Sequence, residues 1–120
     1  MSHYGIGEKE MRFAEMIWEL GPVRSGELAE ICEKEFGWKK STMYTVLSKL
    51  CARGLFQNKK CVVTPLLTKE EFQSKISREF VTGEFGGSLP QFVLAFTGKQ
   101  GLTKKEKEEL LKVVESLKDR

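Results

Sequence analysis

The pattern of apolar and polar positions from Trp38 to Gly54 predicts a helix with two unlike faces. Its apolar side chains recur at i, i+3, i+4 and i+7, the spacing of one face of an α-helix. They are Met43, Val46, Leu47 and Leu50. The opposite face carries hydroxyl and amine groups and no carboxylate: Ser41, Tyr44, Thr45 and Ser48, flanked by Lys49. Such a face suits an anionic polymer with readable edges. The alternative is a solvated helix face that lacks acids.

Two further helices are predicted before this one. An apolar stripe in residues 8–20 is typical of a helix, and Gly21-Pro22 ends it because proline cannot continue a helix. Val23-Arg24 is expected to be a short extended piece. Ser25 is a candidate N-cap for the second helix, which we expect to end near Phe36.

Two short β-prone segments follow the third helix, Leu55–Gln57 and Cys61–Thr64, and Asn58-Lys59-Lys60 between them is a candidate hairpin turn. Three helices followed by a hairpin is the order of a winged helix-turn-helix domain. In that fold the third helix enters the major groove and the hairpin contacts the backbone beside it. The sequence therefore predicts a mainly α fold with a small β-hairpin, and it places a DNA-binding domain in residues 1–67.

Residues 68–120 are predicted to form a second, helical domain. Two capping boxes, which mark helix starts, are Thr68–Glu71 and Thr103–Glu106. Between them, Ser88–Thr97 is expected to form a further short helix. Short amphipathic helices rarely bury all their apolar stripes alone, so we expect them to pack against a second copy of the chain. The alternative is that they fold back onto the first domain. The predicted dimerisation residues are Phe72, Ile76, Phe80, Leu89, Phe92, Val93, Phe96, Leu110, Val114 and Leu117.

The distribution of charge supports the DNA-binding hypothesis more than its total does. The net charge of the 120 residues is only +3. However, the stretch from Phe36 to Lys69 holds seven basic residues and no acid. Within it, the predicted phosphate contacts are Lys39, Lys40, Lys49, Lys59 and Lys60. The residues expected to face base edges are Thr42, Tyr44, Thr45 and Ser48, beside Ser41. Arg24 and Ser25 are expected to add backbone contacts at the start of the second helix.

Other classes of function find little support in the sequence. His3 is the only histidine, so neither a metal site nor Ser/His catalysis is expected, and no cofactor is predicted. The odd set Cys32, Cys51 and Cys61 is no disulfide framework; packing residues are expected, with a thiol sensor as the alternative. A Gly-rich phosphate loop, a paired-acid motif and a CxxC are absent, which disfavours an enzyme. No signal peptide or membrane-spanning run is visible, so a cytoplasmic protein without membrane insertion is expected.

The order of several motifs resembles a known family. In the first helix they are Glu10 and Ile17-Trp18, then Gly21-Pro22. The third helix has Trp38, Thr42-Met43-Tyr44-Thr45-Val46-Leu47, Leu50 and then Gly54. The C-terminal part has Phe85-Gly86-Gly87-Ser88-Leu89, Val93, Phe96, Leu102-Thr103 and Glu108-Glu109-Leu110. Over Ile6 to Leu117 the chain resembles the penicillinase-repressor (BlaI/MecI/CopY) family of bacterial transcriptional regulators.

The resemblance implies a homodimeric winged-helix repressor that binds double-stranded DNA at an inverted-repeat operator and dimerises through its C-terminal helices. It also implies inactivation when a membrane sensor-protease system leads to cleavage in that region. The bond that is Asn-Phe in the penicillinase and methicillin repressors is Ala95-Phe96 here. The CxC…CxC tail of copper-responsive members is absent. Alternatives to the repressor are a protein-protein interaction module and a ligand- or redox-responsive regulator.

Two further departures from the family pattern concern the DNA-binding domain. Lys39-Lys40 replaces the usual Ser-Pro at the start of the third helix, which brings two cations to a place where a phosphate would pass. The segment from Gly54 to Pro65 is several residues shorter than the usual wing and lacks its tyrosine-rich return strand. We therefore expect a reduced contact between the wing and DNA.

Overall fold

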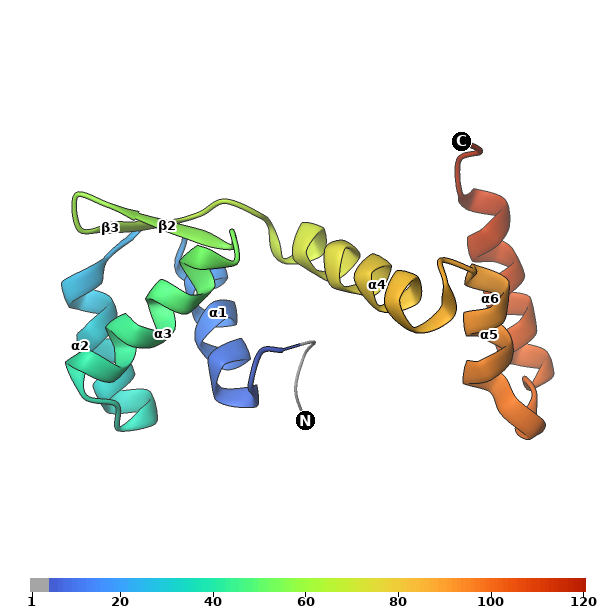
Figure 1. Ribbon diagram of the computed structural model, residues 1–120, viewed down its shortest axis with the longest axis horizontal. Coiled ribbons are helices and arrows are strands. Elements are labelled where there is room, and N and C mark those ends of the chain that lie inside the picture. Colours follow the sequence, from blue (N-terminus) through green and yellow to red (C-terminus); the bar gives the residue numbers. More distant parts are fainter. Residues whose placement is uncertain (1–4) are drawn as a thin grey trace. The chain divides into compact units, whose positions relative to one another are not determined.

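The structure, a computed structural model, describes residues 5–120; His3, weighed above as a ligand, lies outside the described residues. The elements in chain order are α1 (Glu8–Leu20), β1 (Val23–Arg24), α2 (Ser25–Phe36), α3 (Lys40–Ala52), β2 (Phe56–Lys59), β3 (Val62–Pro65), α4 (Lys69–Phe85), α5 (Leu89–Thr97), the 3-10 turn η1 (Gly98–Gln100) and α6 (Lys104–Ser116) (Figure 1). The chain divides into two compact units, of which the first ends at Phe80 and the second begins at Val81.

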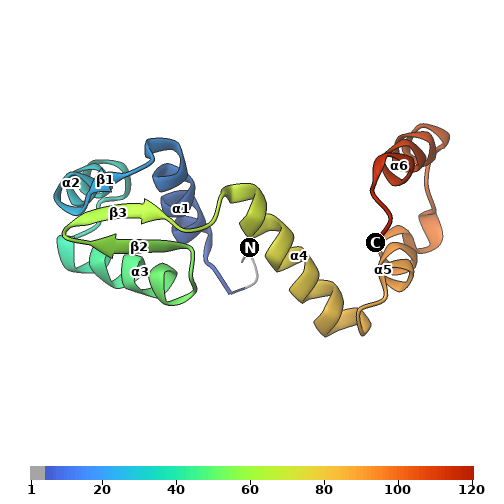
Figure 2. The ribbon, with the colours of Figure 1, turned by 90° about the horizontal axis from the view of Figure 1, so that it is seen from above.

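The first unit contains a three-stranded antiparallel sheet with the strand order β1-β3-β2. The central strand β3 pairs Val63 with Val23 of β1 and Pro65 with Phe56 of β2. Helices α1, α2 and α3 pack against this sheet, and the β2–β3 hairpin follows α3 directly (Figure 2). This is the winged-helix arrangement that the order of helices and hairpin predicts, so the predicted fold class is confirmed.

The core of the first unit is formed by the predicted apolar stripes. On α3, Met43, Leu47 and Leu50 are buried, and Val46 packs partly against them. Trp38, just before α3, lies with its ring centroid 4.8 Å from Phe36 and 5.5 Å from Phe13. Because these residues fix one face of α3 to α1 and α2, the opposite face points to solvent.

The hairpin turn differs from the prediction. β2 continues through Asn58 and Lys59, which pair with Val63 and Val62, so the expected three-residue turn Asn58-Lys59-Lys60 is wrong. The turn consists of Lys60 and Cys61, whose φ angles are 52° and 63°. Two-residue hairpin turns with both residues in the left-handed region match the twist of the strands they join. This strand geometry outweighs the usual preference for glycine and asparagine at such positions.

The structure confirms two of the three predicted helix caps, those at Thr68 and Thr103. Thr68 and Glu71 form a reciprocal capping box at α4, and Thr103 and Glu106 form another at α6. The Ser88 hydroxyl accepts a hydrogen bond from the Gln91 backbone N–H at α5. At α2 the prediction is wrong, because Arg24 is the N-cap and Ser25 is the first helical residue.

Helix α4 belongs to the first unit as far as Phe80. Phe72 is 1% exposed and lies in the core beside Trp18, and Ile76 packs partly against that core. The assignment of Phe72 to a dimer interface is therefore corrected, because its ring is already covered within its own chain. The predicted separation of DNA-binding and dimerisation roles at residues 67 and 68 stays a prediction.

The second unit contains α5, η1 and α6, and no residue from Val81 to Arg120 is buried in the single chain. Phe92 lies with its ring centroid 5.6 Å from Phe85 and 6.0 Å from Phe96. A groove of about 490 Å³ is lined mainly by apolar side chains of α5 and α6, among them Phe96 and Leu110. Within residues 5–120, no helix has the length and apolar character needed to cross a membrane.

Candidate nucleic-acid interface

The outer face of α3 and the hairpin turn present most of the predicted contact residues to solvent. The exposed ones are Arg24, Lys39, Lys40, Ser41, Thr42, Thr45, Ser48, Lys49, Lys59 and Lys60. Ser25 is buried and Tyr44 is half-buried. Two of the twelve predicted residues thus lie mostly beneath the surface, for a reason that their hydrogen bonds explain below.

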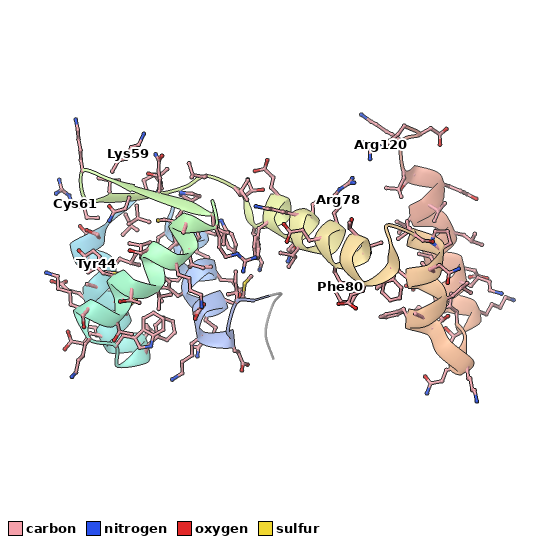
Figure 3. The ribbon with its side chains drawn as sticks, viewed as in Figure 1. Tyr44, Lys59, Cys61, Arg78, Phe80 and Arg120 are labelled. Carbon is pink, nitrogen blue, oxygen red and sulfur yellow. The ribbon has the colours of Figure 1, made fainter. Side chains whose placement is uncertain are left out.

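Lysines mark both ends of this surface. Lys39 is the N-cap of α3 and Lys40 its first residue, and both are exposed. Lys59 and Lys60 lie at the hairpin turn, where Figure 3 shows Lys59 and Cys61. Among residues 5–120, none of these four lysines forms an ion pair. Their ammonium groups are therefore available to phosphates.

Lys49 differs from the other lysines because it already has a partner. Its Nζ lies 3.2 Å from Oε1 of Glu10 on α1, while the Lys49 side chain stays 53% exposed. The other carboxylate oxygen of Glu10 is buried and has no hydrogen-bond partner among the described residues. The carboxylate offsets part of the positive charge at the C-terminal end of α3.

Thr45 lies on the exposed face of α3, and its hydroxyl is hydrogen-bonded within the helix. Its Oγ1 donates a hydrogen bond to the backbone oxygen of Ser41, one turn earlier, at 2.9 Å. Because the hydroxyl proton is used within the helix, the side chain presents its methyl group and acceptor lone pairs to solvent. A methyl group suits contact with thymine, and an acceptor suits the exocyclic amines of adenine and cytosine.

Ser25 joins three elements beneath this surface. Its Oγ accepts a hydrogen bond from the Tyr44 hydroxyl of α3 at 3.0 Å. Its backbone N–H donates to the carbonyl oxygen of Cys61 in the hairpin turn at 2.9 Å. The start of α2, the middle of α3 and the hairpin turn therefore meet at one buried serine. The sequence held no signal for these contacts, since the residues are far apart along the chain.

The three cysteines are free thiols in different environments. Burial raises the pKa of the Cys32 thiol to about 11 and also raises the pKa of Cys51, so both stay protonated at neutral pH. Cys61 is exposed at the hairpin turn. Within residues 5–120, no group of three or more histidine, cysteine, aspartate or glutamate side chains is placed to hold a metal ion.

The fold and this surface together define a winged-helix DNA-binding protein. A helix anchored on one face carries hydroxyls and amines on the other, and a cationic hairpin turn follows it. Because the stretch from Phe36 to Lys69 contains no acid, nothing within it repels a phosphate backbone.

Comparison with known proteins gives the family. The sequence pattern of the penicillinase repressor family matches residues 6–116, nearly the whole chain. The chain is 25% identical over 119 residues to the penicillinase repressor of Bacillus licheniformis, an alignment that covers 96% of the chain and 93% of that protein. It is 24% identical over 115 residues to the methicillin resistance regulatory protein MecI of Staphylococcus aureus (strain Mu50 / ATCC 700699), covering 92% of the chain and 94% of the relative. The MecI protein of Mammaliicoccus sciuri matches with the same identity and coverage.

The chain belongs to the penicillinase repressor family. The members of this family are DNA-binding transcriptional repressors and not enzymes, as expected from the sequence.

Proposed function

We propose that the chain represses transcription by binding a specific DNA operator through α3 and the β2–β3 hairpin. The observation that carries this proposal is the set of exposed, unpaired lysines on an acid-free stretch of sequence, with Lys39 and Lys40 at the start of α3 and Lys59 and Lys60 at the hairpin turn. The names of the relatives, penicillinase repressor and methicillin resistance regulatory protein, support the same class of function. Its site of action would be the cytoplasm, where bacterial DNA lies.

Within this proposal, the exposed residues divide into two roles. Lys39, Lys40, Lys59 and Lys60, with Arg24 at the start of α2, bind phosphates and fix the register on the duplex. Thr42, Thr45 and Ser48, beside Ser41, face base edges in the major groove. Lys49 is also exposed, but its Glu10 partner neutralises part of its charge. Its net contribution to affinity is therefore expected to be smaller than that of Lys39 or Lys40.

We also propose that the repressor is a homodimer on an inverted-repeat operator, joined through the second unit. The support is the amount of apolar surface that the single chain leaves uncovered: Leu89 is 60%, Phe96 78% and Leu117 63% exposed. Large contiguous apolar surfaces on soluble proteins mark interaction sites. The proposed interface residues of the second unit are Leu89, Phe92, Val93, Phe96, Leu110, Val114 and Leu117. Ile76 and Phe80 belong to the first unit, and their part in a dimer stays a prediction.

Release from DNA is proposed to follow cleavage between Ala95 and Phe96 by a membrane sensor-protease system. This bond lies in the last turn of α5, with only Thr97 between Phe96 and the C-cap Gly98, and Phe96 is 78% exposed. Helix ends open locally at low cost, and proteases act on such opened segments. Mass spectrometry of the protein from induced cells should find an N-terminal fragment that ends between Leu94 and Thr97. Derepression with the chain intact would instead assign release to a ligand or another partner.

The experiment that tests DNA recognition is selection of bound duplexes from a random pool with the full chain. A palindromic consensus with half-sites about one helical turn apart, or a multiple of it, is expected for a two-fold dimer. The selected site should be bound at least 10³-fold more tightly than random DNA. Weak binding without a consensus, and with little dependence on salt, would favour the protein-protein interaction module over the repressor.

A further inference from the structure

The hydrogen bond between Tyr44 and Ser25 lies beneath the proposed DNA-binding surface and joins the two helices of the helix-turn-helix. The Tyr44 hydroxyl donates to Ser25 Oγ at 3.0 Å, and Ser25 is only 2% exposed. The Tyr44 ring packs partly against the core of the first unit. A buried hydroxyl that loses its partner costs more free energy than a solvated one, so this bond restricts where α3 can lie against α2.

The same serine also holds the hairpin turn. α2 has no side-chain N-cap, since Arg24 makes no capping hydrogen bond. Instead the first N–H of the helix, from Ser25, donates to the Cys61 carbonyl oxygen at 2.9 Å. Cys61 has a φ angle of 63°, which a residue other than glycine adopts only when its surroundings favour it. The position of the cationic turn is thus tied to the residue that accepts the hydrogen bond of Tyr44.

We infer that Tyr44 and Ser25 are positioning residues, which set α3 and the hairpin turn at a fixed mutual distance so that both meet one DNA duplex. This inference rests on the proposed function. It distinguishes the residues that contact bases from the residues that hold the base-contacting residues in position. In this role the Tyr44 hydroxyl bonds Ser25 and holds α3 in place, and it is not the group that recognises a base. Thr42, Thr45 and Ser48 remain on the reading face.

The competing role for Tyr44 is direct reading of a base by its hydroxyl, as its place in the sequence first suggests. The two roles predict different behaviour of Ser25. If Tyr44 contacted a base directly, the effect of removing its hydroxyl would not depend on Ser25. If the two residues position α3 together, removing either hydroxyl should have the same effect as removing both. Residues that share one interaction show non-additive effects in a double-mutant cycle.

The test uses the full chain with four proteins: wild type, Tyr44→Phe, Ser25→Ala and the double variant. Tyr44→Phe removes only the hydroxyl and keeps the ring in the core. A matched control is Ser77→Ala, which removes an exposed serine hydroxyl on α4, bonded to the Gln73 carbonyl oxygen, outside the proposed DNA-binding surface. For each protein, the affinities for the site selected by wild type and for a random duplex are measured over a range of salt concentrations, together with unfolding in urea.

We expect each single variant to lose about two- to tenfold in affinity for the selected site, the usual worth of one hydrogen bond. The double variant should be no weaker than the weaker single variant. The slope of log affinity against log salt should stay unchanged, because no phosphate contact is removed. Binding to random DNA and the Ser77→Ala control should change by less than about twofold.

Four outcomes would overturn the inference, and they differ from one another. If Tyr44→Phe loses sequence preference at one base pair while Ser25→Ala binds DNA like wild type, Tyr44 contacts that base directly. If the losses of affinity in the two single variants add up in the double variant, the two residues do not act as a unit. If the variants unfold at lower urea concentration while the ratio of specific to random binding is unchanged, the bond only stabilises the fold. If wild type selects no sequence at all, the proposed function itself fails, and this result is seen before any variant is made.

Discussion

The ring of Trp18 lies 5.7 Å from the ring of Phe72, measured between centroids, and this contact fixes the start of α4 to α1. Trp18 also lies 5.4 Å from Phe56 of β2, and its Nε1 donates to the carbonyl oxygen of Leu67 at 2.9 Å. An ion pair of 3.1 Å between Lys69 and Glu15 lies nearby. The first turns of α4 therefore complete the core of the winged-helix unit instead of beginning a separate one.

Replacing Phe72 with alanine should destabilise the first unit by about 3–5 kcal/mol, because the substitution leaves a cavity between Trp18 and the core. Urea denaturation followed by tryptophan fluorescence measures this loss. The matched control is Leu66→Ala, since Leu66 is 51% exposed and its removal should cost about 0.5 kcal/mol or less. Equal losses in the two variants would contradict the placement of Phe72 in the core.

The same contact predicts which fragment folds. A fragment of residues 1–67 lacks Phe72, so one side of the Trp18 ring is left uncovered. A fragment of residues 1–80 contains Phe72 and keeps its contact with Trp18. The longer fragment should unfold cooperatively at a clearly higher urea concentration than the shorter one. Similar midpoints would show that α4 contributes nothing to the first unit.

The lysines at the start of α3 should contribute to DNA binding without regard to sequence. Lys39→Ala and Lys40→Ala are each expected to reduce the magnitude of the log–log salt slope by about 0.9, the value for one lost phosphate contact. Filter binding or fluorescence anisotropy on the selected site and on random DNA measures both slopes. Lys105→Ala is the control, because Lys105 is 87% exposed in the second unit. An unchanged slope in the Lys39/Lys40 double variant would remove these residues from the interface.

Dimerisation should depend on the exposed ring of Phe96. If that ring is buried between two copies, Phe96→Ala should weaken the dimer by about 2–4 kcal/mol, the range of interface hot spots. Sedimentation equilibrium measures the dissociation constant. Gln91→Ala on the same helix is the control, since Gln91 is an exposed polar residue. A wild-type chain that is monomeric at micromolar concentration would refute the proposed dimer.

The capping box of α6 gives a pH dependence with a definite sign. The backbone N–H of Thr103, and then its hydroxyl, hold the pKa of Glu106 below its ordinary value of 4.5. Because the folded pKa is the lower one, the stabilisation is present above the unfolded pKa and is lost as pH falls through the folded pKa. In an NMR titration the Thr103 amide should shift with a midpoint below 4.5. In Glu106→Gln, which keeps an acceptor but cannot ionise, this transition should disappear.

The cysteines should differ in reactivity in the order of their exposure. Cys61 is exposed, Cys51 is partly buried, and Cys32 is buried with a pKa raised to about 11. Alkylation of the native protein with iodoacetamide, followed by mass spectrometry, should label Cys61 first and Cys32 only after unfolding. Rapid labelling of Cys32 in the native state would show that α2 opens from the core.

The sequence by itself determined where most helices begin and which faces they bury. The capping boxes at Thr68 and Thr103, and the apolar stripe of α3, depend on residues three or four positions apart. Within such a distance the helix geometry fixes which groups meet, so the pattern can be found without the fold. The acid-free stretch from Phe36 to Lys69 can also be recognised without the fold, because the absence of carboxylates from a segment is a property of the sequence alone.

Only the tertiary structure decided which side chains are free to act. Tyr44 and Ser25 are 19 positions apart, and Lys49 and Glu10 are 39 apart. Helical periodicity places Tyr44 and Lys49 on or beside the outer face of α3, but it carries no information about partners on α1 and α2. The packing of these helices brings those partners within hydrogen-bond distance, and it also moves Phe72 from an apparently free apolar stripe into the core. The physical reason is that packing between elements, unlike local hydrogen bonding within them, depends on the whole core at once.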